Sequence, residues 1–241
     1  MPTKPSLLKT VLIGGLALLL TGLLAYTAAT TAPGQRALAG LNWLFGLNSP
    51  QLWWYVTRSS AMIAYLLLWL STAWGLAVPS KIITPLIEPA YTFDFHQFIS
   101  LLGIGFMLLH ISVLMLDRYQ PASLWQILIP FLTTYRPLWV GIGILSFYII
   151  LIVTLTFYLR TRIGMRAFRL IHLFSLLSYL GITLHGLFAG TDAVLPSTKL
   201  IYALTGLSII FLTVYWLVLR LQPNQEPTRK APAEHPKTAA R

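Results

Sequence analysis

Six stretches of about twenty mostly apolar residues run through this 241-residue chain, and they restrict it to folds that are stable inside a membrane. A helix needs roughly 20 apolar residues to cross a hydrocarbon core of about 30 Å. Hydrophobic residues make up 56% of the chain and charged residues only 10%, which is too apolar for an ordinary soluble domain. The sequence therefore predicts an all-α integral membrane protein, a six-helix bundle over residues 1–221. The expected spans are Leu7–Ala29, Ser59–Val78, Phe95–Leu116, Leu138–Leu159, Leu170–Phe188 and Leu200–Arg220.

The two ends of the chain need separate interpretations. The first apolar stretch follows Lys4 and Lys9, a pattern that also occurs in secretory signal peptides. Its apolar run is longer than a usual signal-peptide core and no clear Ala-x-Ala cleavage site follows it, which favours a retained helix. Residues 222–241 combine four prolines with polar and charged residues, a composition typical of a disordered tail.

The distribution of basic residues predicts the orientation in the membrane. With six spans both termini lie on one side, and twelve of the 17 lysines and arginines fall there against five opposite. Cytoplasmic segments carry the excess of basic residues, so we expect a multi-pass plasma-membrane protein with both termini in the cytoplasm. Topology thus accounts for the net charge of +11 without nucleic acid as a partner.

Four histidines lie inside the apolar stretches, and ionisable residues at membrane depth are costly enough to mark functional sites. Thirteen residues separate His96 from His110, and twelve separate His172 from His185. At about 1.5 Å per residue, the two members of each helix lie about 20 Å apart. Because the third and fifth spans both run outward, His96 is expected to meet His172 near the cytoplasm (the inner pair). His110 is expected to meet His185 near the outer face (the outer pair).

Two imidazoles at each level suit haem better than a simple metal ion. Zinc takes three or four protein ligands, so two histidines make a poor zinc site. Haem iron needs only two axial ligands, since the porphyrin supplies the other four nitrogens. The chain contains no cysteine, which excludes disulfides, thiolate metal sites and covalent haem attachment. The sequence therefore predicts two stacked b-type haems between the third and fifth spans.

Rotation about the helix axis places the two histidines of the third span on nearly the same face, but not those of the fifth span. At about 100° per residue, His110 returns to within about 40° of His96, whereas His185 lies about 140° from His172. Gly181 is the expected position of a bend that corrects this difference. Small residues in the two spans leave room for a cofactor, although close helix packing explains each equally well. They are Gly103, Gly105, Gly181 and Gly186.

Arginines at both levels are candidates for binding the anionic haem propionates. Topology alone explains the inner ones, whereas Arg58 enters an apolar span on the side where positive charge is less expected. Arg58 is therefore expected to contact the outer haem or an anionic acceptor. The candidates are Arg162, Arg166 and Arg169 at the inner level and Arg58, Arg118 and Arg136 at the outer level.

The histidine pattern resembles that of the ferric reductase and NADPH oxidase superfamily. The family's membrane domain is a six-helix bundle whose third and fifth helices carry two histidines each, at similar spacing. The resemblance covers roughly Trp53 to Asp192 and implies that the four span histidines are axial haem ligands. Other stretches look like a bacterial branch of the family. They are Thr57-Arg58-Ser59-Ser60, Leu128-Ile129-Pro130-Phe131, Tyr135-Arg136-Pro137-Leu138-Trp139, Phe168-Arg169-x-x-His172 and His185-Gly186-Leu187-Phe188-Ala189-Gly190-Thr191-Asp192.

Reductases of this family continue into cytoplasmic flavin and nicotinamide domains, whereas only a short tail follows Arg220 here. The resemblance therefore implies a membrane oxidoreductase component that receives electrons from a separate cytoplasmic reductase or from quinol. That partner would supply any flavin or quinone, and the outer acceptor would be a ferric chelate or a periplasmic protein. Two alternatives stay open: a haem-bearing anchor subunit like that of the bacterial methionine-sulfoxide reductase system, and a transporter or scaffold that binds no haem.

Overall fold

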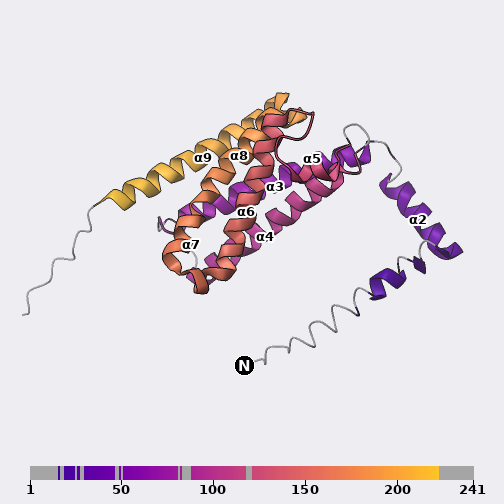
Figure 1. Ribbon diagram of the computed structural model, residues 1–241, viewed down its shortest axis with the longest axis horizontal. Coiled ribbons are helices and arrows are strands. Elements are labelled where there is room, and N and C mark those ends of the chain that lie inside the picture. The colour runs from indigo at the N-terminus through magenta and orange to yellow at the C-terminus, as the bar shows by residue number, and fades with distance from the viewer. Residues whose placement is uncertain are drawn as a thin grey trace, which may run out of the picture.

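The computed structural model describes residues 16, 19–24, 26–27, 30–46, 49, 51–80, 82, 88–117 and 121–222. Over these residues the chain forms helices and turns, with no strand. The helices are α2 (Ala32–Phe45), α3 (Leu52–Ala77), α4 (Pro89–Leu114), α5 (Leu124–Leu128), α6 (Pro137–Ile163), α7 (Met165–His172), α8 (Phe174–Ala189), the 3₁₀ helix η1 (Thr191–Val194) and α9 (Pro196–Leu221). Figure 1 shows the long helices grouped together, with α2 apart from them.

Five helices in the described part of the chain are long and apolar enough to cross a membrane, which confirms that prediction for the second to sixth expected spans. The first expected span, Leu7–Ala29, lies largely outside the described residues, as does the tail beyond residue 222. Each of the five begins earlier than expected from the apolar runs alone. They are Leu52–Ala77, Tyr91–Leu114, Pro137–Ile163, Met165–Ala189 and Pro196–Leu221.

Local signals explain why these helices extend past their apolar runs. Pro89, Pro137 and Pro196 lie in the first turns of α4, α6 and α9. Proline suits a first turn, because it lacks the N–H that such a turn leaves unpaired and its φ is already helical. Arg160 and Arg162 lie in the last turn of α6, where positive charge interacts favourably with the helix dipole.

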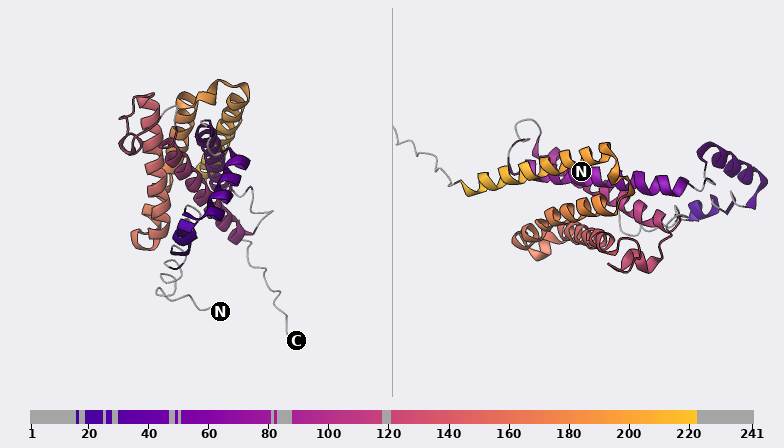
Figure 2. Two further views of the ribbon diagram at one scale, coloured as in Figure 1. Left: turned by 90° about the vertical axis from the view of Figure 1, so that its right-hand side faces the viewer. Right: turned by 90° about the horizontal axis from the view of Figure 1, so that it is seen from above.

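Contacts through α3 hold the long helices together. This helix packs along α4 and also contacts α8 and α9, while α6 packs along α8. The view from above in Figure 2 shows α9, in orange and yellow, running alongside α3 in purple. At the shared core the Tyr65 hydroxyl lies 2.6 Å from Thr205 Oγ1 and 3.2 Å from the Tyr179 hydroxyl. Such hydrogen bonds between helices stabilise helix association in a membrane.

Apolar side chains cover the outside of the long helices. In α9, only 11% of the most apolar 18-residue stretch is buried. Its side chains Leu200, Leu207 and Phe211 are exposed. An apolar surface of this extent is unfavourable in water but suits contact with lipid tails. The helices therefore fit a lipid bilayer environment.

The fifth span consists of two helices joined by a tight turn. Helix α7 ends at His172 and α8 begins at Phe174. At the junction the Leu173 N–H donates to the Leu170 carbonyl at 3.3 Å, an i to i−3 bond of the 3₁₀ type. A 3₁₀ turn rotates the chain by about 120° per residue instead of about 100°. The turn therefore reduces the angle about the helix axis that separates the side chains of His172 and His185.

The predicted position of the bend, at Gly181, is thus wrong. Gly181 lies inside the continuous helix α8, where a Cβ atom would collide with Ser146 of α6. This glycine allows close approach of α6 and α8. The break lies eight residues earlier, at Leu173, directly after the first histidine of the span.

Candidate functional site

The structure brings the inner pair, His96 of α4 and His172 of α7, together. Their ring centroids are 6.1 Å apart and the ring planes are inclined by 70°. An imidazole nitrogen binds a metal ion at about 2.0–2.1 Å, so two imidazoles on opposite sides of one ion have ring centres about 6 Å apart. The separation of the inner pair therefore fits two axial ligands of one metal ion.

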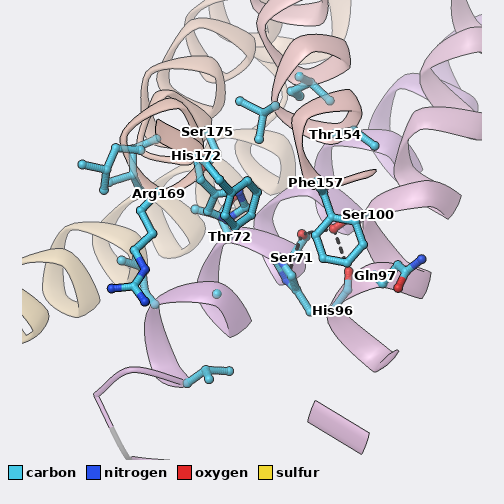
Figure 3. Close-up of a pocket in the computed structure, with 18 of the residues that line it drawn as sticks. Ser71, Thr72, His96, Gln97, Ser100, Thr154, Phe157, Arg169, His172 and Ser175 are labelled. Carbon is cyan, nitrogen blue, oxygen red and sulfur yellow. Dashed lines mark hydrogen bonds between the residues drawn. The ribbon is translucent and has the colours of Figure 1, made fainter. Parts of the chain in front are cut away.

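A cavity of about 1120 Å³ adjoins the inner pair, and its wall is mostly apolar. Small-molecule sites typically measure about 300–1,000 Å³, so this cavity has room for a large cofactor. Figure 3 shows Ser71, His96 and Ser100 close together on one side of it, with Arg169 on another. The cavity is thus apolar in bulk, with imidazole and guanidinium groups at its edge.

The outer pair, His110 of α4 and His185 of α8, is held by two backbone carbonyl groups. His110 Nδ1 lies 2.9 Å from the Thr57 carbonyl oxygen of α3, and His185 Nδ1 lies 3.0 Å from the Trp139 carbonyl oxygen of α6. The two rings are close enough to interact electrostatically. Helix α4 and the α7–α8 span therefore run in the same direction, with one histidine pair toward each end.

These two hydrogen bonds determine which ring nitrogen carries the proton. A carbonyl oxygen only accepts, so Nδ1 of both His110 and His185 must be the donor. The neutral ring then has its lone pair on Nε2. Metal-binding histidines typically donate their second ring N–H to a carbonyl in this way, which fixes the tautomer and the ring orientation. The lone pair on Nε2 of each outer ring is therefore available to a ligand.

Two glycines, which the sequence alone does not single out, make room for the imidazoles. A Cβ atom at Gly143 of α6 would lie 2.6 Å from His185 Nδ1, and one at Gly75 of α3 would lie 3.2 Å from His96 Cε1. Each glycine follows by four residues, or one helical turn, a residue that contacts the same ring. Those residues are Trp139 for His185 and Ser71, whose Oγ is 3.4 Å from Nδ1, for His96.

Two buried polar side-chain atoms in the described residues have no hydrogen-bond partner, Thr57 Oγ1 and His172 Nδ1. One belongs to the inner pair, and the other to the residue whose carbonyl holds His110. An unpaired buried polar atom costs about 1–3 kcal/mol. His172 Nδ1 therefore has no protein partner among the described residues that fixes its tautomer, unlike the Nδ1 atoms of the outer pair.

The inner arginines divide into two groups. Arg166 and Arg169 line the cavity, whereas Arg162 is not part of its wall. Arg220, at the end of α9, also lines it and was not predicted from the sequence. The sequence places Arg220 at the end of the last span, but only the packing of α9 decides that its side chain faces the cavity.

The outer arginines make protein contacts. Arg58 forms an ion pair with Asp192 and lies 3.8 Å over the Trp54 ring, and Arg136 donates to the Phe188 carbonyl. Arg118 lies outside the described residues. The guanidinium groups of Arg58 and Arg136 are thus engaged within the protein.

Two of the four glycines predicted to leave room for a cofactor, Gly181 and Gly186, serve helix packing. A Cβ atom at Gly103 would lie 3.4 Å from Leu67, and Gly186 lies against the Tyr202 hydroxyl. Gly105 faces open space, with no described atom within 4 Å of a Cβ there. Close packing is therefore the better interpretation of Gly181 and Gly186, whereas Gly103 also lines the cavity beside the inner pair.

Each level offers two imidazoles without a third protein ligand. In the part of the chain that the structure describes, no three His, Cys, Asp or Glu side chains come together as a metal-binding group. A haem needs only two protein ligands, so the pairs suit haem. Comparison of the chain with protein-family models, curated proteins and solved structures finds no match.

Proposed function

We propose that this chain is a haem-b electron-transfer protein of the plasma membrane and a member of the ferric reductase superfamily. In this proposal His96 and His172 hold an inner haem, and His110 and His185 hold an outer haem. Electrons pass from a cytoplasmic reductase or a quinol to an extracytoplasmic acceptor such as ferric iron. The chain is then the membrane component of an oxidoreductase that works with a separate donor.

The arrangement of the four histidines carries the proposal. The inner rings have the separation of two ligands on one ion, at 6.1 Å between centroids. The outer rings each donate Nδ1–H to a carbonyl, which leaves Nε2 free to bind. Hydrogen-bonded packing histidines explain one such residue, but not two pairs at opposite ends of the same helices.

Haem would supply the redox chemistry, because its iron exchanges one electron between the ferric and ferrous states. The protein's own residues orient the imidazoles and surround them with apolar helices that exclude water. Arg166, Arg169 and Arg220 border the inner cavity. Guanidinium groups form strong hydrogen bonds with carboxylates, so they suit the propionates of an inner haem.

The direction of electron flow is supported by the basic residues. The inner pair lies at the end of the helices that also holds Arg166, Arg169 and Arg220. Basic residues are enriched at the cytoplasmic side of membrane proteins. We therefore infer that electrons enter at the inner pair and leave at the outer pair.

An absorption spectrum of the purified protein tests the proposal. We expect a reduced-minus-oxidised spectrum typical of low-spin b-type haem, and pyridine haemochrome quantitation should give two haems per chain. One haem per chain would contradict the two-haem arrangement. A colourless protein, after expression with sufficient haem supply, would favour a transporter or scaffold.

A second measurement separates the two redox alternatives. Chemically reduced protein in vesicles should reoxidise on addition of an external ferric chelate if it is a ferric reductase component. If ferric chelates have no effect but a periplasmic reductase subunit reoxidises it, the chain is an anchor subunit instead.

A further inference from the structure

The ion pair between Arg58 and Asp192 joins the two parts of the chain that support the outer pair. Arg58 directly follows Thr57, whose carbonyl accepts the hydrogen bond from His110. Asp192 lies in η1, just after α8, the helix that carries His185. The pair spans 134 residues of sequence, so only the folded structure brings its members together.

The guanidinium group holds Asp192 with two nitrogens. Arg58 Nε donates to Oδ2, and the NH2 nitrogen pairs with Oδ1. Paired contacts of this kind are strong and fix geometry, because the planar fork matches the two carboxylate oxygens. Trp54, one helical turn earlier in α3, lies beneath the guanidinium at 3.8 Å. Arg58 is therefore fixed from two sides.

We propose that the Arg58–Asp192 pair is a clamp that positions His110. It does so by holding the first turns of α3, and with them the Thr57 carbonyl, at a fixed place beside the imidazole. This inference rests on the proposed function and extends it by naming the residues that set the environment of the outer haem. Arg58 and Asp192 are positioning residues, which act through Thr57 rather than by contact with haem.

The clamp adds a tertiary contact to the local hydrogen bonds at the start of α3. Its N-cap residue, Gln51, makes no side-chain capping hydrogen bond, and its own N–H donates to Ser49 Oγ at 3.3 Å. The carbonyl that holds His185 has other supports. Near Trp139, the Tyr135 hydroxyl donates to the Ala189 carbonyl and Arg136 donates to the Phe188 carbonyl. Loss of the clamp should therefore affect His110 and leave His185 in place.

The functional consequence concerns the strength of His110 as a ligand. A hydrogen bond from Nδ1–H to a carbonyl fixes the ring and raises its basicity, which tunes the bound metal. A displaced Thr57 carbonyl would let the ring rotate and weaken that bond. The spectrum of the outer haem should therefore change while that of the inner haem stays the same.

A double-mutant cycle distinguishes positioning from simple electrostatics. The variants are Arg58→Gln, Asp192→Asn and the double substitution, and the readout is the electron paramagnetic resonance spectrum of each ferric haem with its midpoint potential. For a clamp, all three variants shift the outer haem's g values in the same direction and to the same extent, because each breaks the same contact. A purely electrostatic role predicts opposite potential shifts in the two single variants and near cancellation in the double variant, which would overturn the clamp.

Arg58→Lys adds a test at constant charge, because lysine keeps the positive charge but not the planar fork. It should show the same g-value shift as Arg58→Gln. Arg162→Gln, at a residue outside the cavity wall, is the matched control and should leave both haems unchanged.

A readout without haem keeps this inference separate from the proposed function. Hydrogen–deuterium exchange of the purified protein should be faster at the start of α3 in Arg58→Gln and Asp192→Asn, and unchanged at the start of α6. Equal exchange in all variants would overturn the clamp even if the protein binds two haems. Faster exchange in a protein that binds no haem would instead leave the clamp standing and reject the proposed function.

Discussion

Gly143 of α6 faces His185 of α8 so closely that a Cβ atom at residue 143 would lie 2.6 Å from the imidazole Nδ1. Real Cβ atoms essentially never approach another atom so closely, so the ring would have to move. The Nδ1 that would be displaced is the atom that donates to the Trp139 carbonyl. The position of His185 thus depends on the absence of a side chain on the neighbouring helix.

Gly143→Ala should therefore remove or distort the outer haem site and leave the inner site intact. Alanine favours a helix interior over glycine by about 1 kcal/mol, so the backbone effect runs in the opposite direction. Haem content and low-spin spectra of the variant provide the measurement. Gly105→Ala, where a Cβ meets open space, is the control and should keep both haems. Two normal haems in Gly143→Ala would contradict the assigned position of His185.

Single substitutions of the four histidines by alanine should fall into two groups. His96→Ala and His172→Ala should both lose the inner haem, because their rings form one pair with centroids 6.1 Å apart. His110→Ala and His185→Ala should both lose the outer haem. Spectra of the four variants decide the matter. If His96→Ala and His185→Ala shared one phenotype, the pairing would be wrong.

Arg169→Gln should weaken retention of the inner haem. Arg169 lines the cavity but is exposed, so its charge is screened and its contribution is expected at about 1 kcal/mol or less, roughly a fivefold change. Haem transfer to an excess of apomyoglobin gives the retention of each haem over time. Arg162→Gln should behave like the unsubstituted protein, since Arg162 is outside the cavity wall. Equal haem loss in both variants would indicate a general effect of positive charge.

Tyr65→Phe should destabilise the helical core by about 1 kcal/mol, the usual net value of one hydrogen bond. The substitution removes the hydroxyl that contacts both Thr205 and Tyr179 and leaves the ring packing in place. Thermal unfolding in detergent measures the change. Tyr91→Phe, at a 70% exposed side chain, is the matched control. A Tyr65→Phe protein as stable as the control would mean that these hydroxyl contacts contribute nothing.

The sequence alone was sufficient to predict the second to sixth spans, because a helix that bonds its own backbone groups in lipid needs about 20 consecutive apolar residues to cross the hydrocarbon core. It also predicted that His96 and His172 lie together. Helix rise converts sequence spacing into depth, so His96 and His172 were expected at one level and the other two at the second level. Both arguments depend only on properties that repeat along one helix.

Tertiary structure decided how each site is built. The Thr57 and Trp139 carbonyls reach their histidines across 53 and 46 residues of sequence, and the Arg58–Asp192 pair spans 134. No periodicity within one helix encodes such contacts, because they depend on the rotation and the crossing of packed helices. For the same reason the sequence did not predict that the helix break lies at Leu173 and not at Gly181. Nor did it identify Gly143 as a site residue, because that role depends on the packing of His185 against α6. Spacing along the chain determines the depth of a side chain, whereas the packing of neighbouring helices determines its partners.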